Sequence, residues 1–323
     1  MKVGVIGVGK MGANHIKSFC NIKNATLVGC CDVDKDRVNE ISTLYNIKGY
    51  YNYRDMINDI DAVIIATQTI YHYEIAKFFM ENGKHVLVEK PITFKYDEAE
   101  KLIEIAKENN VKFTVGHVER FNPVIDVLKN IFNSNETIAM SVKRMSPVDN
   151  RVQDIDVVLD LMIHDIDAIL YIMDGKKINN IEAIGRSVKK ESIEQKNCDY
   201  AVAYIYFNNG VIVDLTASRV TEKKIRNLYI NSVDKFIEVN YMDKSITIFS
   251  QLERNLEDKI GYKNEFITKE AFIINKDALI EQNQNFVDSI VRNVPLKVKA
   301  EEALIDLKVV NIIREKIYNK KFI

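Results

Sequence analysis

The chain has 323 residues, 47% of them hydrophobic and 28% charged, a composition that fits a globular protein long enough for two domains. Its 45 lysines and arginines nearly balance 46 aspartates and glutamates, so no basic surplus points to nucleic acid or to an anionic membrane surface. No apolar run approaches the length of a membrane span, and because an apparent strand begins at Lys2 we expect no signal peptide.

Strands and helices are predicted to alternate over the first 120 residues. The expected strands are Lys2–Val8, Thr26–Asp32, Tyr50–Tyr51, Ala62–Ala66, His85–Val88 and Lys112–Gly116. The expected helices are Lys10–Ile22, Lys35–Tyr45, Tyr53–Asn58, Tyr71–Asn82 and Tyr96–Asn110. Short apolar runs of this kind are typical of strands buried on both faces. The alternation therefore predicts an α/β domain of the Rossmann type, with a doubly wound parallel sheet.

The pattern changes after Pro123, where segments with a period of two follow one another. The expected strands are Thr137–Arg144, Ile181–Val188, Tyr200–Phe207, Val211–Ser218, Ile225–Asn231, Phe236–Asn240 and Ser245–Phe249. The expected helices are Val124–Phe132, Val157–Met173, Ala278–Arg292 and Ala300–Tyr318. This order predicts an α+β domain with a large, mostly antiparallel, open sheet. We expect a first domain over residues 1–120 and a second over 121–323. The last helix of the second domain could pack back on the first.

A glycine-rich turn follows the first strand. Its sequence, Gly7-Val8-Gly9-Lys10-Met11-Gly12, matches G-x-G-x-x-G, and the second strand ends on Asp32, twenty residues after Gly12. This is the dinucleotide-binding fingerprint in its strand–turn–helix context. The glycines allow a tight turn, the approach of a pyrophosphate and close packing of the helix, while the acid accepts hydrogen bonds from the ribose. A 2′-phosphate would meet the Asp32 carboxylate, so we expect NAD(H), with Arg37 stacking near adenine.

Glu89-Lys90-Pro91 follows a predicted strand at the carboxyl edge of the parallel sheet, where ligands of α/β proteins bind. A lysine at this edge can reach a sugar hydroxyl, a cofactor ribose or both. An ordinary surface lysine in a loop is an equally good interpretation from position alone. Pro91 permits a cis peptide bond, but the sequence does not decide the isomer.

Asp160 and His164 are four residues apart in a largely apolar helix that also carries Asp165 and Asp167, a spacing that puts the pair on one face. They could form a catalytic dyad in which the carboxylate supports the imidazole as it takes a proton. A metal site is a weaker interpretation because no second histidine lies nearby. The alternative is a core histidine in an acid-rich helix, although two polar groups in so apolar a segment would be costly without partners.

The segment between the domains adds candidates for binding a polar or anionic substrate. Glu119 and Arg120 lie there, and Arg144 and Arg151 flank a later loop. Each arginine could instead form an ordinary ion pair. The four cysteines include no C-x-x-C pair, so reduced thiols in a cytoplasmic protein are expected rather than a metal site or disulfides.

Several of these motifs together resemble the glucose-fructose oxidoreductase and inositol dehydrogenase family over nearly the whole chain. They are the glycine motif with His15, Ala66-Thr67-Gln68 with His72, Glu89-Lys90-Pro91, and Asp160-x-x-x-His164. The resemblance implies hydride transfer between a nicotinamide and a hydroxyl-bearing ring carbon, with NAD as the cofactor. It also implies a C-terminal sheet that mediates homodimers or homotetramers. The chain departs from the family at Gln68, where proline is usual.

The resemblance also implies roles for individual residues. Lys90 would orient the substrate hydroxyl and contact the nicotinamide ribose, and His164 would exchange the proton beside Asp160. Thr67, Gln68, His72 and Glu89 would line the nicotinamide half of the cofactor site. Residues 116–123 and 156–167 look closest to the branch that oxidises C3 of UDP-N-acetylglucosamine, in which Arg144 or Arg151 would meet the diphosphate.

The sequence therefore predicts an NAD-dependent dehydrogenase acting on a sugar or nucleotide-sugar, with UDP-N-acetylglucosamine as the leading substrate. An inositol or free-hexose dehydrogenase of the same family is the alternative enzyme. A non-catalytic NAD-sensing protein is the alternative of another class, and the presence of Lys90, Asp160 and His164 argues against it.

Overall fold

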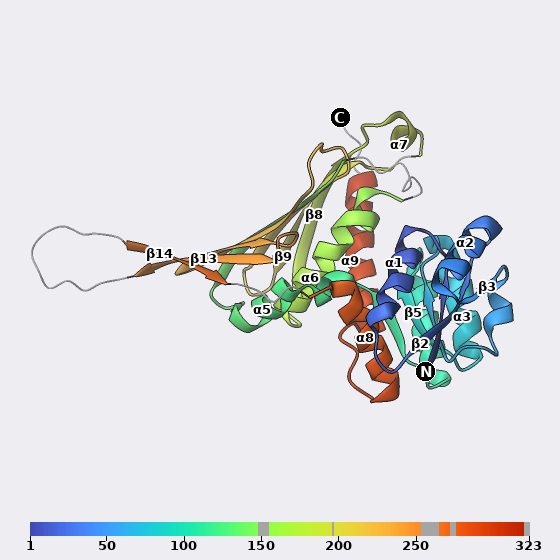
Figure 1. Ribbon diagram of the computed structural model, residues 1–323. Helices are drawn as coiled ribbons and strands as arrows, with labels where there is room; N and C mark the ends of the chain where they lie inside the picture. The colour runs from blue at the N-terminus through green and yellow to red at the C-terminus, as the bar shows by residue number, and fades with distance from the viewer. Residues whose placement is uncertain (148–154, 196, 253–264, 272–275, 320–323) are drawn as a thin grey trace, which may run out of the picture. The chain divides into compact units, whose positions relative to one another are not determined.

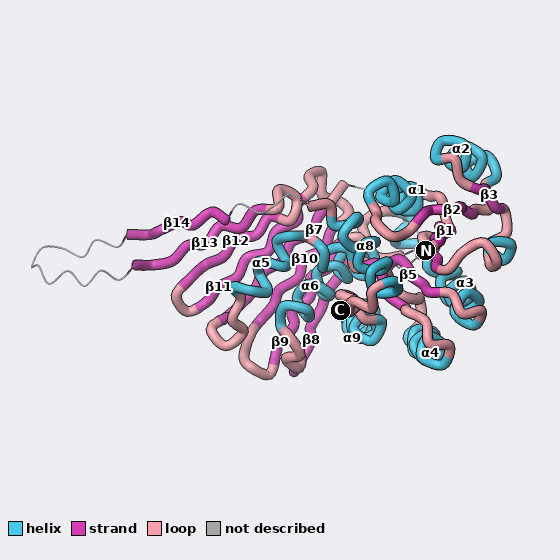
Figure 2. Tube along the Cα trace, turned by 60° about the horizontal axis from the view of Figure 1, so that its bottom comes forward, coloured by secondary structure: helices cyan, strands magenta, loops and turns pink. Residues whose placement is uncertain are grey.

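The computed structural model describes residues 1–147, 155–195, 197–252, 265–271 and 276–319. The chain forms two compact units, each made of two segments. The first unit comprises Met1–Phe121 and Asp277–Lys308, and the second comprises Asn122–Lys276 and Val309–Ile323. Figure 1 follows the elements along the chain, and Figure 2 shows one sheet in each unit.

The sheet of the first unit has six parallel strands in the order β3-β2-β1-β4-β5-β6. The strands are β1 (Lys2–Ile6), β2 (Thr26–Cys31), β3 (Lys48–Tyr50), β4 (Ala62–Ile65), β5 (His85–Glu89) and β6 (Phe113–Gly116). The strand order reverses between β1 and β4, and ligands of such sheets bind at this switch point, beyond the carboxyl ends of the strands. The predicted doubly wound Rossmann sheet is confirmed.

Helices cover both faces of this sheet. They are α1 (Lys10–Ser18), α2 (Lys35–Tyr45), α3 (His72–Glu81) and α4 (Tyr96–Glu108), with the 3-10 turns η1 (Phe19–Asn21), η2 (Tyr53–Met56), η3 (Thr69–Tyr71) and η4 (Val118–Phe121). In Figure 2, α1 and α2 lie on one face, and α3 and α4 on the other. All four residues of β4, Ala-Val-Ile-Ile, are buried. Because helices cover both faces of the sheet, this strand has no alternation of polar and apolar residues.

A segment from late in the chain completes the core of the first unit. Helix α8 (Ala278–Val291) contacts α1 and η4, and its Phe286 belongs to the same buried cluster as Val3 and Ile16. The apolar side of α8 is therefore covered within the first unit. The sequence interpretation placed residues 121–323 in the second domain, whereas residues 277–308 belong to the first unit. The sequence pattern of a helix does not say which sheet the helix will pack on.

The sheet of the second unit has eight strands in the order β14-β13-β12-β11-β7-β10-β9-β8. Only the β7–β10 pair is parallel among its described pairings, so the expected mostly antiparallel sheet is confirmed. The strands are β7 (Thr137–Met145), β8 (Ile178–Arg186), β9 (Tyr200–Phe207), β10 (Ile212–Ser218), β11 (Ile225–Ser232), β12 (Lys235–Asn240), β13 (Ser245–Leu252) and β14 (Glu265–Ala271).

One face of this sheet is covered and the other is open. On β9, Ala201, Ala203 and Ile205 are buried, whereas the alternating Tyr200 and Tyr204 are exposed and Val202 is half-buried. The covering elements include α5 (Pro123–Ile131), a π-helical turn η5 (Val158–Met162) and α6 (Ile163–Met173), which Figure 2 shows against the sheet. The alternation of buried residues with exposed or half-buried ones reflects this one-sided covering.

Most predicted elements are present, with ends shifted by a few residues. The π-helical turn, the short helix α7 (Lys190–Glu194) and β14 were not predicted. Helix α9 matches its predicted bounds, Ala300–Tyr318. The Val157–Met173 segment was expected to be one regular helix, and that expectation is wrong in its first part, where the turn widens to the π form.

Three of the four cysteines are buried, and all four are free thiols. Burial, with a smaller contribution from Asp32, raises the pKa of Cys30 to about 11, so this thiol stays protonated and unreactive. Within the described part of the chain, no helix is both long and apolar enough to span a membrane.

Candidate active site

Each glycine of the first loop meets a different steric demand. Gly7 has φ +84°, and a Cβ there would lie 2.5 Å from the Ala66 carbonyl oxygen. At Gly12 a Cβ would lie 1.8 Å from the Gly7 carbonyl oxygen, so helix α1 packs against the loop only because no side chain is present. A Cβ on Gly9 would have no atom within 4 Å. Gly9 thus opens onto space that a pyrophosphate can enter, as the fingerprint predicts.

The start of α1 offers unpaired backbone donors to an anion. Gly9 is its N-cap residue, with no side-chain hydrogen bond to cap the helix and no acid in the first turn. The Lys10 and Met11 amides that follow are among the first N–H groups of the helix, which have no acceptor within it. This end of α1 fits the diphosphate of a dinucleotide. Lys10 is exposed and Met11 half-buried.

Asp32 lies at the carboxyl end of β2, where its carboxylate is already oriented by the backbone. One oxygen accepts a hydrogen bond from the Val8 amide at 2.8 Å, and the other accepts one from the Asp34 amide at 3.1 Å. Each carboxylate oxygen can accept further bonds, so a ribose diol can still bind here. Arg37 is exposed in the first turn of α2, whose N-cap Asp34 accepts its amide at 3.1 Å.

His72 joins the loops that follow β4 and β5. Its Nδ1 lies 2.9 Å from the Pro91 carbonyl oxygen and its Nε2 lies 3.2 Å from that of Thr67. Burial lowers the pKa of His72 below its usual value despite these carbonyl partners, so the ring is neutral and donates one hydrogen. Its expected place at the nicotinamide remains a prediction. In this structure the ring fixes the two loops around Thr67 and Pro91.

The departure at Gln68 leaves the turn intact. Gln68 is the N-cap residue of η3 and adopts φ −65° and ψ 144°. This φ is the value that a proline ring imposes, so the backbone keeps the conformation expected for the family's proline.

Glu89 and Lys90 end β5 at the same edge of the sheet. Glu89 is buried, and its carboxylate lies 2.9 Å from Nε2 of His15. Its second oxygen accepts the Lys90 amide at 3.2 Å, and the Lys90–Pro91 bond is cis. Burial raises the pKa of Glu89, but the hydrogen bond and charge of His15 and the charge of Lys90 outweigh it, so the pKa lies below its usual value. Glu89 is therefore an anion that anchors the turn carrying Lys90.

Asp160 and His164 lie on adjoining helical turns of the second unit. Asp160 is in the π-helical turn η5, and His164 is in the first turn of α6. Both are half-buried, whereas Leu159 and Ile163 beside them are buried. Four residues is close to one turn in either helix type, so the two polar side chains share a side of the segment, as predicted. π-helical turns occur frequently at functional sites.

Asp156 fixes the start of this segment. It is fully buried, and one of its oxygens accepts the amides of Val158 and Leu159 at 3.1 and 3.0 Å. Its other oxygen accepts Nε of Arg314 at 2.7 Å and the hydroxyl of Tyr318 at 2.8 Å. The sequence interpretation missed this anchor, because its partners come from the last helix of the chain.

The candidate substrate-binding arginines have protein partners. Arg144 is 2% exposed and forms a bidentate pair with Asp165, with both N–O distances 2.8 Å. Arg120, also 2% exposed, is paired with Glu302. Both arrangements favour the ion-pair interpretation over a diphosphate contact. Glu119 is buried, and Arg151 lies outside the described residues.

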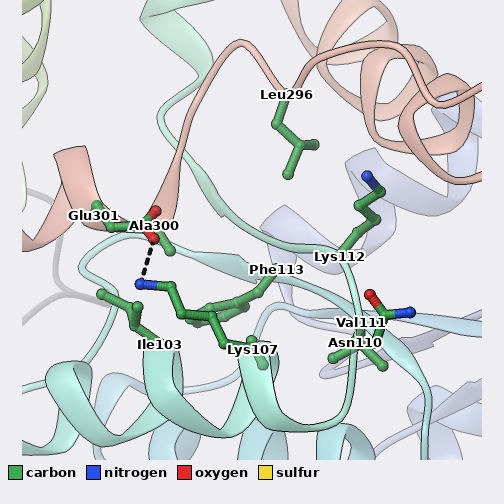
Figure 3. Close-up of a pocket in the computed structure, with 10 residues that line it drawn as sticks. Ile103, Lys107, Asn110, Val111, Lys112, Phe113, Leu296, Ala300 and Glu301 are labelled. Atoms are coloured by element: carbon green, nitrogen blue, oxygen red, sulfur yellow. Dashed lines mark ion pairs between the residues drawn. The ribbon is translucent and has the colours of Figure 1, made fainter.

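A cavity of about 370 Å³ in the first unit lies away from the glycine loop. Its lining includes Lys112 and Phe113, at the start of β6, so it is at the amino edge of the strands. Figure 3 shows the Lys107–Glu301 ion pair, 2.9 Å long, at its wall. The nucleotide elements described above are at the opposite, carboxyl edge, so this cavity is not the cofactor site.

Comparison with known proteins agrees with the two-unit arrangement. A family model described as "Oxidoreductase family, NAD-binding Rossmann fold" matches residues 1–117, and the "GFO/IDH/MocA C-terminal domain" matches residues 140–239. UDP-N-acetylglucosamine 3-dehydrogenase of Acidithiobacillus ferrooxidans is 29% identical over 296 residues, which cover 92% of this chain and 90% of that protein. Myo-inositol 2-dehydrogenase of Thermotoga maritima is 26% identical, over 94% and 92% of the two chains.

Solved structures agree in fold. That of the Acidithiobacillus ferrooxidans UDP-N-acetylglucosamine 3-dehydrogenase has a TM-score of 0.86 at 27% identity, covering 98% of this chain and 97% of that chain. Scyllo-inositol dehydrogenase of Lactobacillus casei, solved with bound NAD(H) and scyllo-inositol, has a TM-score of 0.80 at 21% identity and covers 99% and 97%. With the glycine loop, the Glu-Lys-Pro turn and both matched domains in place, the chain belongs to the GFO/IDH/MocA family of NAD-binding oxidoreductases.

Proposed function

We propose that this protein is an NAD-dependent dehydrogenase that oxidises a ring hydroxyl, with C3 of UDP-N-acetylglucosamine as the substrate carbon. The observation that carries the proposal is the combination of a Lys90 turn anchored by a buried carboxylate and a half-buried Asp160–His164 pair on a π-helical segment. A cofactor-binding protein without chemistry needs neither. The similarity to the Acidithiobacillus ferrooxidans enzyme along nearly the whole chain supports this substrate.

The proposed reaction removes two hydrogens from the secondary alcohol, the hydrogen on the ring carbon as a hydride and the hydroxyl hydrogen as a proton. NAD⁺ supplies the acceptor for the hydride that leaves the ring carbon. His164 takes the hydroxyl proton, and the carboxylate of Asp160 stabilises the imidazolium that forms. The ammonium group of Lys90 lowers the energy of the developing alkoxide by hydrogen bonding and charge. The carbon–hydrogen and oxygen–hydrogen bonds break, the carbonyl forms, and the products are a ketone, NADH and one proton.

Substrate identity is tested by comparing turnover of three compounds with NAD⁺. UDP-N-acetylglucosamine is expected to give the highest kcat/KM, ahead of myo-inositol and glucose. Faster turnover of myo-inositol would instead support the inositol dehydrogenase alternative, which the 26% identity to the Thermotoga maritima enzyme also favours. NADH binding without turnover of any of the three would support the NAD-sensing alternative.

Two substitutions test the assigned roles, each with a matched control. Lys90→Met and His164→Gln are expected to lower kcat by about 10²–10⁴-fold, the range typical of acid–base groups. Lys95→Met removes an exposed lysine five positions along the same loop, and His85→Gln removes a histidine at the amino end of β5. Both controls are expected to retain near-normal kcat. Normal rates in Lys90→Met or His164→Gln would contradict the assignment.

The open face of the second sheet is the proposed interface between copies of this chain. Its exposed side chains include Ile184, Tyr200, Tyr204 and Ile212, which are 53%, 38%, 42% and 42% exposed. An apolar, tyrosine-bearing surface of this kind is typical of protein interfaces. We expect a homodimer or homotetramer by light scattering, and Tyr204→Glu with Ile212→Glu is expected to shift it toward monomer. A monomeric wild-type protein would contradict this. A cytoplasmic location, expected from the sequence, is also part of the proposed function.

A further inference from the structure

A chain of buried polar contacts links the glycine-loop helix, the Lys90 turn and helix α8. His15 on α1 is completely buried, with Nε2 2.9 Å from Oε1 of Glu89 and Nδ1 3.1 Å from Oδ1 of Asn283. Asn283, also completely buried, extends its amide nitrogen to within 2.7 Å of the Ser18 hydroxyl oxygen. All four residues belong to the first unit.

The hydrogen at Ser18 determines the direction of this chain. The Ser18 hydroxyl donates its only hydrogen to the His15 carbonyl oxygen at 2.6 Å. Ser18 must therefore accept from Asn283, so the amide nitrogen of Asn283 faces Ser18 and its oxygen faces His15. The ring atom Nδ1 of His15 must then donate to that oxygen.

Both ring nitrogens of His15 consequently face acceptors. Nδ1 donates to an amide oxygen, and Nε2 faces a carboxylate whose pKa is held below its usual value by His15 and Lys90 against the effect of burial. A neutral imidazole has a single donor and would leave one of these contacts unmade. The acceptor at Nε2 is a carboxylate, whereas the neutral His72 faces two uncharged carbonyl oxygens, so at His15 this pattern favours an imidazolium ion paired with the Glu89 anion.

The surroundings of His15 show which other groups bear on its charge. From β5, Glu89 is the nearest charge, followed by Lys90, which lowers the Glu89 pKa. From α8 and α1, the contacting groups Asn283 and Ser18 are uncharged. His72 on α3 is influenced by Glu89 but is neutral because of its burial. The Glu89 anion is thus the partner that stabilises a charge on His15.

This ion pair is tightly confined beneath the Lys90 turn. A Cβ on Gly116, the residue paired with Glu89 across the sheet, would lie 2.8 Å from Oε1 of Glu89. The carboxylate is therefore held between His15 and the β6 backbone, with its other oxygen on the Lys90 amide. Any change in the charge of His15 would alter the hydrogen bonding of the carboxylate that holds this turn.

We propose that His15, kept as an imidazolium by Asn283 and Glu89, is a positioning residue that fixes the turn carrying Lys90. Helix α8, far along the chain, thereby becomes part of the machinery that orients Lys90. The inference rests on the proposed function for its effect on catalysis, but the protonation of His15 does not depend on it. The charge and the catalytic effect can therefore be tested separately.

The charge of His15 can be read directly by NMR on ¹⁵N-histidine-labelled protein. The chain has five histidines, so each signal can be assigned by substituting its histidine in turn. We expect both nitrogens of His15 to carry a hydrogen at the pH of the activity assay, and His72 to carry a single one. A singly protonated His15 at this pH would overturn the inference whether or not any sugar is oxidised.

The link to Lys90 is tested by two variants of similar size at position 283. Asn283→Leu removes the acceptor for Nδ1, and Asn283→Asp retains it. Asn283→Leu is expected to lower kcat on the order of 10-fold or more, with the KM for NAD⁺ little changed, because the Lys90 turn is displaced rather than the glycine loop. The alkaline limit of the kcat profile should move to lower pH in Asn283→Leu and not in Asn283→Asp.

A merely structural role predicts a different result. It would lower the melting temperature of Asn283→Leu while leaving the pH profile and the His15 signals unchanged, and that result would overturn the proposal. Should Asn283→Leu fail to fold, Ser18→Ala frees the Asn283 amide to turn, and we expect it to shift the His15 titration in the same direction. An unchanged titration in Ser18→Ala would count equally against the inference. A normal His15 response with no turnover of any sugar would refute the proposed function alone.

Discussion

Gly12→Ala should lower the stability of the fold and Gly9→Ala should lower the affinity for NADH, although the two glycines belong to one motif. A Cβ at Gly12 would lie 1.8 Å from the Gly7 carbonyl oxygen, whereas ordinary contacts begin near 3.4 Å. The helix and the loop would have to separate by the difference, 3.4 − 1.8 = 1.6 Å. The obstructing atom is backbone and cannot rotate away, so we expect a cost of about 3 kcal/mol, the upper end of ordinary overpacking.

Gly9→Ala should leave folding nearly unchanged. Its φ of −60° suits alanine, and a Cβ there would have no atom within 4 Å. The change at a helix N-cap costs less than about 1 kcal/mol. The new methyl group occupies the space assigned to the pyrophosphate, so NADH affinity should fall by more than about 10-fold, or about 1.4 kcal/mol.

Thermal melting without cofactor and calorimetric titration with NADH distinguish the two effects. The Gly12→Ala melting temperature is expected to fall by about 6–12 °C, from about 2–4 °C per kcal/mol for chains approaching this size. The melting temperature of Gly9→Ala should equal that of the wild type, and its affinity for NADH should be lower. Wild-type NADH affinity in Gly9→Ala, or wild-type melting in Gly12→Ala, would refute the assignment of these two glycines.

Four further outcomes follow from the contacts of single residues. Asp32→Ala should narrow the preference for NAD⁺ over NADP⁺ in kcat/KM, and a wild-type enzyme that prefers NADP⁺ would contradict the role of Asp32. Arg144→Met should lower the free energy of urea unfolding by about 3–5 kcal/mol, because it removes the bidentate guanidinium partner of the buried Asp165 carboxylate; a loss below about 1 kcal/mol would count against a buried pair. Since burial lowers the His72 pKa, the unfolded chain binds more protons, so stability should fall as the pH drops below about 6.5, and His72→Asn should flatten this dependence. Gln68→Pro should raise stability by about 0.4–1 kcal/mol, because Gln68 already has φ −65°, and a lower melting temperature would contradict this.

The cofactor half of the site could be predicted from sequence because its signals are local. The glycine spacing, the strand before it and the acid at the end of the next strand all depend on residues close together in the chain. In the structure, each glycine of the motif has a different steric role, and the Val8 amide orients the Asp32 carboxylate. Steric and backbone constraints of this kind act within one βαβ unit, so a sequence pattern can report them.

The remaining features depend on contacts between residues far apart in sequence. Asn283 lies 268 residues from His15, and no local pattern indicates that they meet. The pairing of Arg144 with Asp165 likewise joins a strand to a helix, and the sequence left open whether this arginine forms an ion pair or meets a diphosphate. The π-helical turn could not be distinguished from an α-helix, since both satisfy the same apolar spacing around Asp160.

The central claim is that a ring carbon of a sugar gives its hydride to NAD⁺. The direct measurement uses UDP-N-acetylglucosamine carrying deuterium at C3, with mass spectrometry of the reduced cofactor. Deuterium should appear in the NADH, with slower turnover than for the unlabelled sugar, and His164→Gln should abolish the transfer. Reduced cofactor without deuterium would exclude C3 as the hydride donor, and no reduction with this sugar would contradict the proposed substrate.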